Sequence, residues 1–106
     1  MPKYLIQANY VGDGIKGLLK DGGTGRRATV EKLISSVGGK MEAFYYAFGD
    51  TDLFVIADAP DNVTAAALSL IVNAAGSATA KVTVLLTPEE IDAAAKKTAS
   101  YRPPGQ

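Results

Sequence analysis

The side chains that could do chemistry in this 106-residue chain are few, because it contains no His, Cys or Trp. Without Cys there is no disulfide, thiolate nucleophile or thiolate metal ligand. Without His the commonest general base, the commonest metal ligand and the usual proximal haem ligand are all missing. Proton transfer is left to carboxylates, Lys and Tyr, and no run of carboxylates is spaced to hold a metal ion. We therefore expect neither a metal nor a cofactor.

Two sets of carboxylates are candidates for proton transfer. Glu42 lies in an aromatic-rich segment, where enclosure would favour its protonated form and suit it to general acid or base catalysis. Asp50 and Asp52 share a Gly-containing turn, in which carboxylates stabilise the turn itself. Glu42 is therefore the candidate catalytic residue.

Two Gly-rich segments resemble binding loops. Gly12-Asp13-Gly14-Ile15-Lys16-Gly17 matches the G-x-G-x-x-G pattern, but dinucleotide binding also needs a parallel βαβ unit and an acidic residue about 20 positions later. We interpret this match as turn glycines. In the segment from Gly22 to Arg27, free backbone N–H groups, a helix start and the side chains of Arg26 and Arg27 could hold an anion. A helix start with two solvated arginines explains the same residues.

The charge balance and the hydropathy pattern limit the partners. Eleven Lys and Arg oppose eleven Asp and Glu, so no surplus of positive charge is available for nucleic acid. No apolar run approaches the roughly 20 residues of a membrane-spanning helix, and the N-terminal residues lack the apolar region of a secretory signal. We expect a cytoplasmic protein that binds neither nucleic acid nor membranes.

The elements that must position these residues alternate in type. Turn residues and apolar periodicity predict strands over 3–10, 40–48, 53–57 and 81–86, and helices over 13–20, 24–37, from Pro60 to Gly76, and from Thr87 to about Thr98. The two middle strands should form a hairpin, and Thr87-Pro88-Glu89-Glu90 is a capping box. The order βαββαβ with an added helix predicts a ferredoxin-like α+β fold, with helices on one face of a four-stranded antiparallel sheet. We expect one domain over residues 1–98 and an extended tail over 99–106, either frayed or laid across a neighbouring subunit.

Alternation along the strands divides their side chains between two faces. We assign one nearly all-apolar set to the helices: Tyr4, Ile6, Ala8, Met41, Ala43, Tyr45, Ala47, Leu53, Val55, Ala57, Val82, Val84 and Leu86. The other set is Leu5, Gln7, Asn9, Glu42, Phe44, Tyr46, Phe48, Asp52, Phe54, Ile56, Lys81, Thr83 and Leu85. It is too apolar to remain in water. We expect a second copy to cover it, which gives a homodimer or a higher homo-oligomer.

Pairing of two such sheets would enclose the polar residues of this second face. The candidate ligand-binding residues there are Gln7, Asn9, Glu42, Phe44, Tyr46, Phe54, Lys81 and Thr83. Glu42 and Lys81 would form an ion pair if their strands approach each other. The alternative is that these polar residues tune dimer specificity or lie on a solvated rim.

The chain resembles the GYD domain family, small bacterial proteins of about this length. The segments that carry the resemblance are residues 2–6, 17–23, 39–45, 86–90 and 100–105. The turn that names the family stands here as Phe48-Gly49-Asp50-Thr51-Asp52, with Thr51 in place of the aromatic residue. The resemblance implies a ferredoxin-like fold of the dimeric α+β barrel kind, and it implies no activity and no catalytic residue.

Two classes of function fit these observations. The first is a homo-oligomeric module that binds a small apolar molecule or acts as a scaffold. The second is a cofactor-independent monooxygenase or an isomerase for a small aromatic or lactone substrate, an analogy of fold alone. In such an enzyme Glu42 would be the base, Tyr46 and Asn9 would position the substrate, and Phe44 and Phe54 would form an apolar wall. Haem degradation is disfavoured by the missing His.

Overall fold

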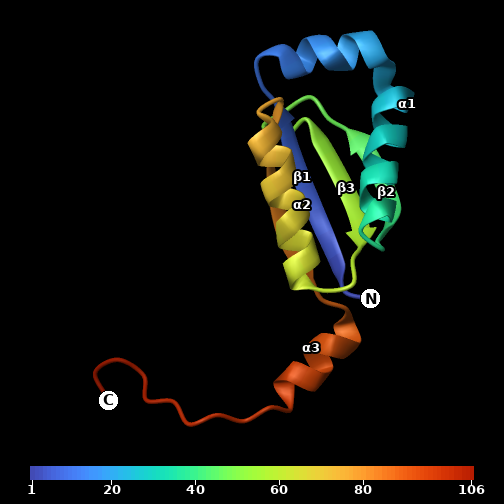
Figure 1. Ribbon diagram of the computed structural model, residues 1–106. Helices are drawn as coiled ribbons and strands as arrows, with labels where there is room; N and C mark the ends of the chain where they lie inside the picture. Colours follow the sequence, from blue (N-terminus) through green and yellow to red (C-terminus); the bar gives the residue numbers. More distant parts are fainter.

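The computed structural model describes residues 1–106 as a four-stranded sheet with helices on one face (Figure 1). Along the chain the elements are β1 (Lys3–Tyr10), α1 (Asp13–Ser36), β2 (Lys40–Tyr46), β3 (Leu53–Asp58), α2 (Asn62–Ala75), β4 (Ala78–Leu85) and α3 (Pro88–Ala95). The strand order is β2-β3-β1-β4, and each neighbouring pair is antiparallel. The predicted ferredoxin-like α+β fold is confirmed. Since β1 has no parallel neighbour, the glycines that follow it do not open a dinucleotide-binding unit.

The ends of α2 and α3 follow the expected capping chemistry. The backbone N–H of Thr64 donates to the Asp61 carboxylate over 2.8 Å, which lowers the pKa of Asp61 below its usual range. Gly76 ends α2 in the left-handed region with φ of 81°. Thr87 and Glu90 make both hydrogen bonds of the predicted capping box, at 3.1 and 3.0 Å. These local signals therefore set where both helices begin and where α2 ends.

The first helical region contains a sharp bend. The two predicted helices form one element, α1, which kinks at Gly22 with φ of 78° and ψ of 163°. A side chain would oppose this backbone conformation, so Gly supplies the bend. The first half of α1 crosses the end of the sheet, and the second half runs down beside β2 (Figure 1).

The core lies between the sheet and the helices. One cluster contains six buried residues, among them Ile34 of α1, Val55 of β3 and Leu68 of α2. A second, smaller cluster surrounds Tyr4, whose phenol donates to the Asn62 side chain over 2.7 Å. The predicted helix-facing residues of β1 and β3 are confirmed, because Tyr4, Ala8, Leu53, Val55 and Ala57 are buried.

The predicted faces of β2 are wrong from Ala43 onward, whereas Glu42 lies on the helix-free face with Lys3, as predicted. A register shift between Met41 and Ala43 inserts a bulge, and the pairing then continues as Phe44 with Val55 and Tyr45 with Phe54. A bulge adds one residue to a strand, so every later side chain changes face. Phe44 packs against the core cluster and Tyr46 contacts Gly23 of α1, whereas Ala43 and Tyr45 lie on the face that carries no helix.

Several element boundaries also differ from the predicted ones, by up to three residues. β2 ends at Tyr46 rather than Phe48, and α3 ends at Ala95 rather than Thr98. β4 begins at Ala78, because the end of β1 pairs with residues 78–80 and the Asn73 side chain both accepts from and donates to the backbone of Ala80. Tertiary pairing thus extends a strand whose first residues have weak strand propensity.

The last helix and the residues after it lie apart from the sheet. No residue of α3 is buried, and the chain runs away from the body after Ala95 (Figure 1). Val84 and Leu86, predicted to contact helices, are about half exposed at this end of β4. No helix of the chain combines the length and the apolar character that crossing a bilayer requires.

Two glycines of α1 make a matched test of this packing. A Cβ on Gly14 would lie 1.9 Å from the Ser77 backbone oxygen, whereas a Cβ on Gly17 meets nothing within 4 Å. Gly14→Ala should lower the free energy of unfolding by about 2–3 kcal/mol, because backbone must shift. Gly17→Ala should raise it by about 0.5–1 kcal/mol, because Ala loses less backbone freedom. Urea unfolding followed by circular dichroism measures both, and equal effects would contradict the close contact.

Candidate functional site

The core of the domain is not completely filled. A hollow of about 80 Å³, here called the inner hollow, lies between the sheet and the two helices. α1 packs mainly on β2 and α2 mainly on β4, at opposite edges of the sheet, so the central strands are covered less closely (Figure 1). Thirteen of its fourteen lining residues are hydrophobic, and they are Ile6, Ala8, Tyr10, Val30, Leu33, Ile34, Leu53, Val55, Leu68, Val72, Ala78, Ala80 and Val82, with Ser69 as the fourteenth.

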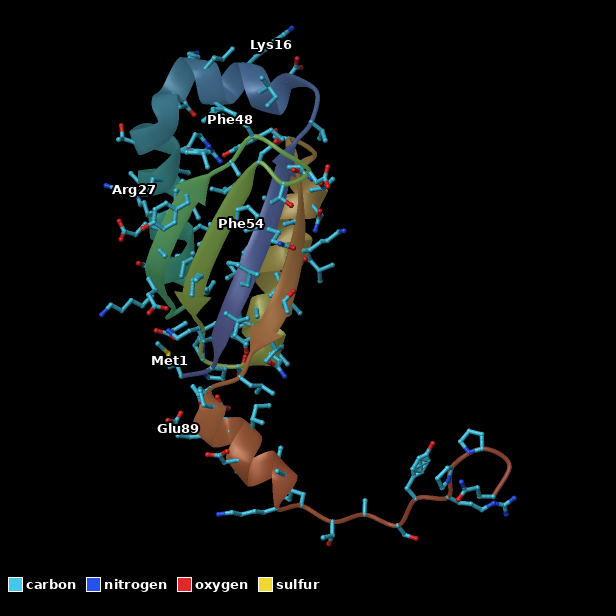
Figure 2. The ribbon with its side chains drawn as sticks, turned by 180° about the vertical axis from the view of Figure 1, so that it is seen from behind. Met1, Lys16, Arg27, Phe48, Phe54 and Glu89 are labelled. Atoms are coloured by element: carbon cyan, nitrogen blue, oxygen red, sulfur yellow. The ribbon has the colours of Figure 1, made fainter.

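A second and wider hollow lies at the end of the sheet, beneath the first half of α1. This end hollow measures about 500 Å³. Figure 2 shows Phe48, a fully exposed side chain, in the space below this part of the helix. The lining residues are Tyr10, Ile15, Leu18, Leu19, Gly22, Gly23, Tyr46, Ala47, Phe48 and Asp52. Tyr10 therefore lines both hollows.

Hydrogen bonds fix the walls of the end hollow. The Tyr46 phenol donates to the Gly23 carbonyl over 3.0 Å and so ties β2 to the bend of α1. The Asp52 carboxylate accepts from the Tyr10 backbone N–H over 3.0 Å, and the Asp52 N–H donates to the Asn9 side-chain oxygen over 2.8 Å. Burial, and after it the nearby Tyr10, raises the pKa of Tyr46, so its phenol is neutral at pH 7.

The candidate ligand-binding residues are divided by the bulge in β2. Gln7 pairs in register with both Phe54 and Lys81, and its neighbour Leu5 pairs with Thr83. These side chains, with Asn9, lie on the helix-free face as predicted, and Figure 2 shows Phe54 over the middle of that face. Phe44 and Tyr46 lie on the helix side instead.

Glu42 occupies a different setting from the one predicted. Its carboxylate lies 2.7 Å from Lys3 Nζ, which also lies 3.0 Å from Asp58, and the Glu42 side chain is 52% exposed. Glu42 and Asp58 together raise the pKa of Lys3 through these hydrogen bonds. The predicted ion pair between Glu42 and Lys81 is wrong within one chain, because β2 and β4 are opposite edges of the sheet. The enclosure that would suit Glu42 to acid–base catalysis is absent in the single chain.

The two arginines proposed for anion binding have unlike surroundings. Arg26 is half-buried and lies 3.9 Å from the Asp21 carboxylate. Arg27 is exposed, and Figure 2 shows it extending outward from the edge of the molecule. No group of three or more acidic side chains comes close enough together to hold a metal ion.

Sequence reasoning did not single out Tyr10 or the inner hollow. One signal for Tyr10 was present, since alternation from Tyr4, Ile6 and Ala8 places it on the helix side of β1. The hollow itself depends on how far apart the two helices lie, and no local pattern of residues reports that distance.

The Lys3 cluster predicts a pH dependence. The pKa of Lys3 is raised in the folded state, so its ion pairs stabilise the fold below the ordinary lysine pKa, and this stabilisation is lost as the pH rises through the raised value. Glu42→Gln removes one partner and leaves Asp58. At pH 7 we expect the melting temperature of Glu42→Gln to lie within about 4 °C of that of the unmodified chain. Between about pH 10 and 12 the melting temperature of Glu42→Gln should fall by less than that of the unmodified chain. Thermal melts measure both, and an equal alkaline loss would contradict the role of Glu42.

Comparison with known proteins agrees with this architecture. A sequence model described as the GYD domain matches residues 4–95, which covers every strand and all three helices. No curated protein and no solved structure matches the chain. With most of its length covered by that match, the chain belongs to the GYD domain family.

Proposed function

We propose that this protein is a homo-oligomeric module that binds a small apolar molecule in the inner hollow. The observation that carries the proposal is the hollow itself, which is almost wholly hydrophobic and lies between the sheet and both helices. Protein interiors are normally packed as densely as organic crystals. An unfilled apolar space of about 80 Å³ costs about 2 kcal/mol at the usual penalty per unit of volume.

The lining of the inner hollow favours an apolar occupant over water. A buried water needs two to four polar partners. Two lining residues, Tyr10 and Ser69, carry hydroxyl groups, but only their carbon atoms face the hollow. An apolar group would restore the missing dispersion contacts without burying an unpaired polar atom. This supports binding of a small molecule rather than a purely scaffolding role.

The same lining disfavours the enzyme hypothesis. No carboxylate or lysine lines the inner hollow. Glu42, the candidate base, lies at the edge of the sheet in an ion pair with Lys3. A ligand in the hollow would therefore meet no carboxylate, lysine or histidine that could act as a general base.

The helix-free face of the sheet supports self-association. Leu5 and Ile56 are direct cross-strand neighbours there, and Tyr45 and Phe54 are another pair. Tyr45 is 71% exposed. Apolar surface of this kind, running across neighbouring strands, typically marks an interface in a soluble protein. A second copy of the same sheet offers a complementary apolar surface under two-fold symmetry, which gives the dimeric barrel.

Charge placed on this face should separate the subunits. Phe54→Lys puts two ammonium groups into the paired faces of a symmetric dimer, and desolvating them is costly. The unmodified chain should elute as a dimer or larger at micromolar concentration, and Phe54→Lys as a monomer with unchanged circular dichroism. Val63→Lys is the matched control, because Val63 is exposed on α2 and its charge should leave the oligomer intact. Light scattering after gel filtration measures the mass of each oligomer. A monomeric unmodified chain would contradict the proposed interface.

Filling the inner hollow should abolish ligand binding. Ala80→Leu adds three carbon atoms to a lining residue, and we expect it to displace an apolar probe such as p-xylene. Ala74→Leu is the control, because Ala74 is an exposed residue of α2 and lines neither hollow. Ligand-observed NMR should detect p-xylene on the unmodified chain and on Ala74→Leu but not on Ala80→Leu. Absence of binding to the unmodified chain would overturn the proposed function.

A further inference from the structure

The two hollows meet at one residue. Tyr10 ends β1 and lines both the inner hollow and the end hollow. Its backbone is held by the Asp52 carboxylate, so the position of its side chain is tied to the turn between β2 and β3. The Tyr10 side chain therefore lies between the wide end hollow and the apolar inner hollow.

Polar groups gather where the hollows meet. The Tyr46 phenol lines the end hollow, donates to the Gly23 carbonyl and lies close to the Tyr10 phenol. Because the proton of Tyr46 is used on Gly23, its oxygen is left to accept a hydrogen bond. The Tyr10 hydroxyl can donate or accept. Together these two phenols can satisfy a ligand hydroxyl, which donates to the Tyr46 oxygen and accepts from the Tyr10 hydroxyl.

One charged side chain lines the end hollow. The Asp52 carboxylate accepts from the Tyr10 backbone N–H and forms no ion pair, whereas Arg26, nearby, faces Asp21 over 3.9 Å. The other residues that line the end hollow, including Leu18, Leu19 and Phe48, carry no charge. The carboxylate disfavours an anionic ligand and the apolar inner hollow disfavours any charged group, so the site suits a neutral molecule.

We propose that Tyr10 and Tyr46 form a polar subsite that binds the hydroxyl group of a neutral and otherwise apolar ligand, whose apolar end enters the inner hollow. This assignment rests on the proposed function, because it names the chemical class of the molecule bound there. The bend at Gly22 makes the subsite possible, since it carries the first half of α1 across the end of the sheet and forms the roof of the end hollow (Figure 1).

A pair of probes of nearly equal size tests this subsite. p-Cresol and p-xylene differ by a hydroxyl in place of a methyl group, and both are neutral at pH 7. Isothermal titration should show p-cresol binding about tenfold more tightly than p-xylene, as one or two hydrogen bonds in an apolar site predict. Tyr10→Phe should remove most of this preference and leave the affinity for p-xylene unchanged. Tyr46→Phe should weaken p-cresol binding in the same way.

The controls separate this subsite from the inner hollow. Tyr45→Phe removes a phenol from the helix-free face of the sheet, next to Phe54, and should leave the preference for p-cresol intact. Equal affinities for the two probes, or a preference that survives both Tyr10→Phe and Tyr46→Phe, would overturn the polar subsite while leaving the proposed function in place. Failure of the unmodified chain to bind either probe would overturn both.

Discussion

The apolar cluster around Ile34 and Val55 is the constraint on which the rest of the structure depends. Both residues are almost completely buried, and they join α1, the central strand β3 and, through Leu68, α2. Because both helices must bury their apolar sides on this one face, the other face of the sheet is left without cover. The same arrangement produces the free apolar face and the inner hollow. Both helices pack on one face, which leaves the other face free, and they lie at opposite edges, which leaves a hollow between them.

The bulge in β2 determines on which face of the sheet each aromatic residue of that strand lies. Without it Phe44 would point away from the helices; with it Phe44 packs on the core cluster and Tyr45 joins Phe54 on the free face. Tyr46 is turned toward the bend of α1, where its phenol bonds to Gly23. One extra residue in an edge strand therefore supplies a hydrophobic contact to the core, an aromatic ring to the proposed dimer interface and a polar group to the end hollow.

The chemistry available in the hollows is that of recognition by shape and hydrogen bonding. The chain has neither His nor Cys, and its best-placed carboxylates are engaged: Asp52 with the backbone of Tyr10, Asp61 with the backbone of Thr64, and Glu42 and Asp58 with Lys3. These carboxylates are engaged in contacts within the fold. The phenols at the junction of the hollows are the groups that the proposed ligand would meet.

The sequence by itself determined the order of the elements, the starts of α2 and α3, the end of α2 and the helix-facing residues of β1 and β3. Each of these follows from local chemistry: apolar periodicity, the Thr87–Glu90 capping box, and Gly76 in its left-handed conformation. The tertiary structure alone decided the face of Phe44 and Tyr46, the partner of Glu42 and the two hollows at Tyr10. The alternation of side chains between the two faces of β2 shifts by one residue at the bulge, and only the strand pairing reveals that bulge. The approach of Glu42 to Lys3 depends on the order of the strands in the sheet. Gly22 permits the bend of α1, but the hollows also depend on the separation of whole helices, which arises from packing across the sheet rather than from a local pattern of residues.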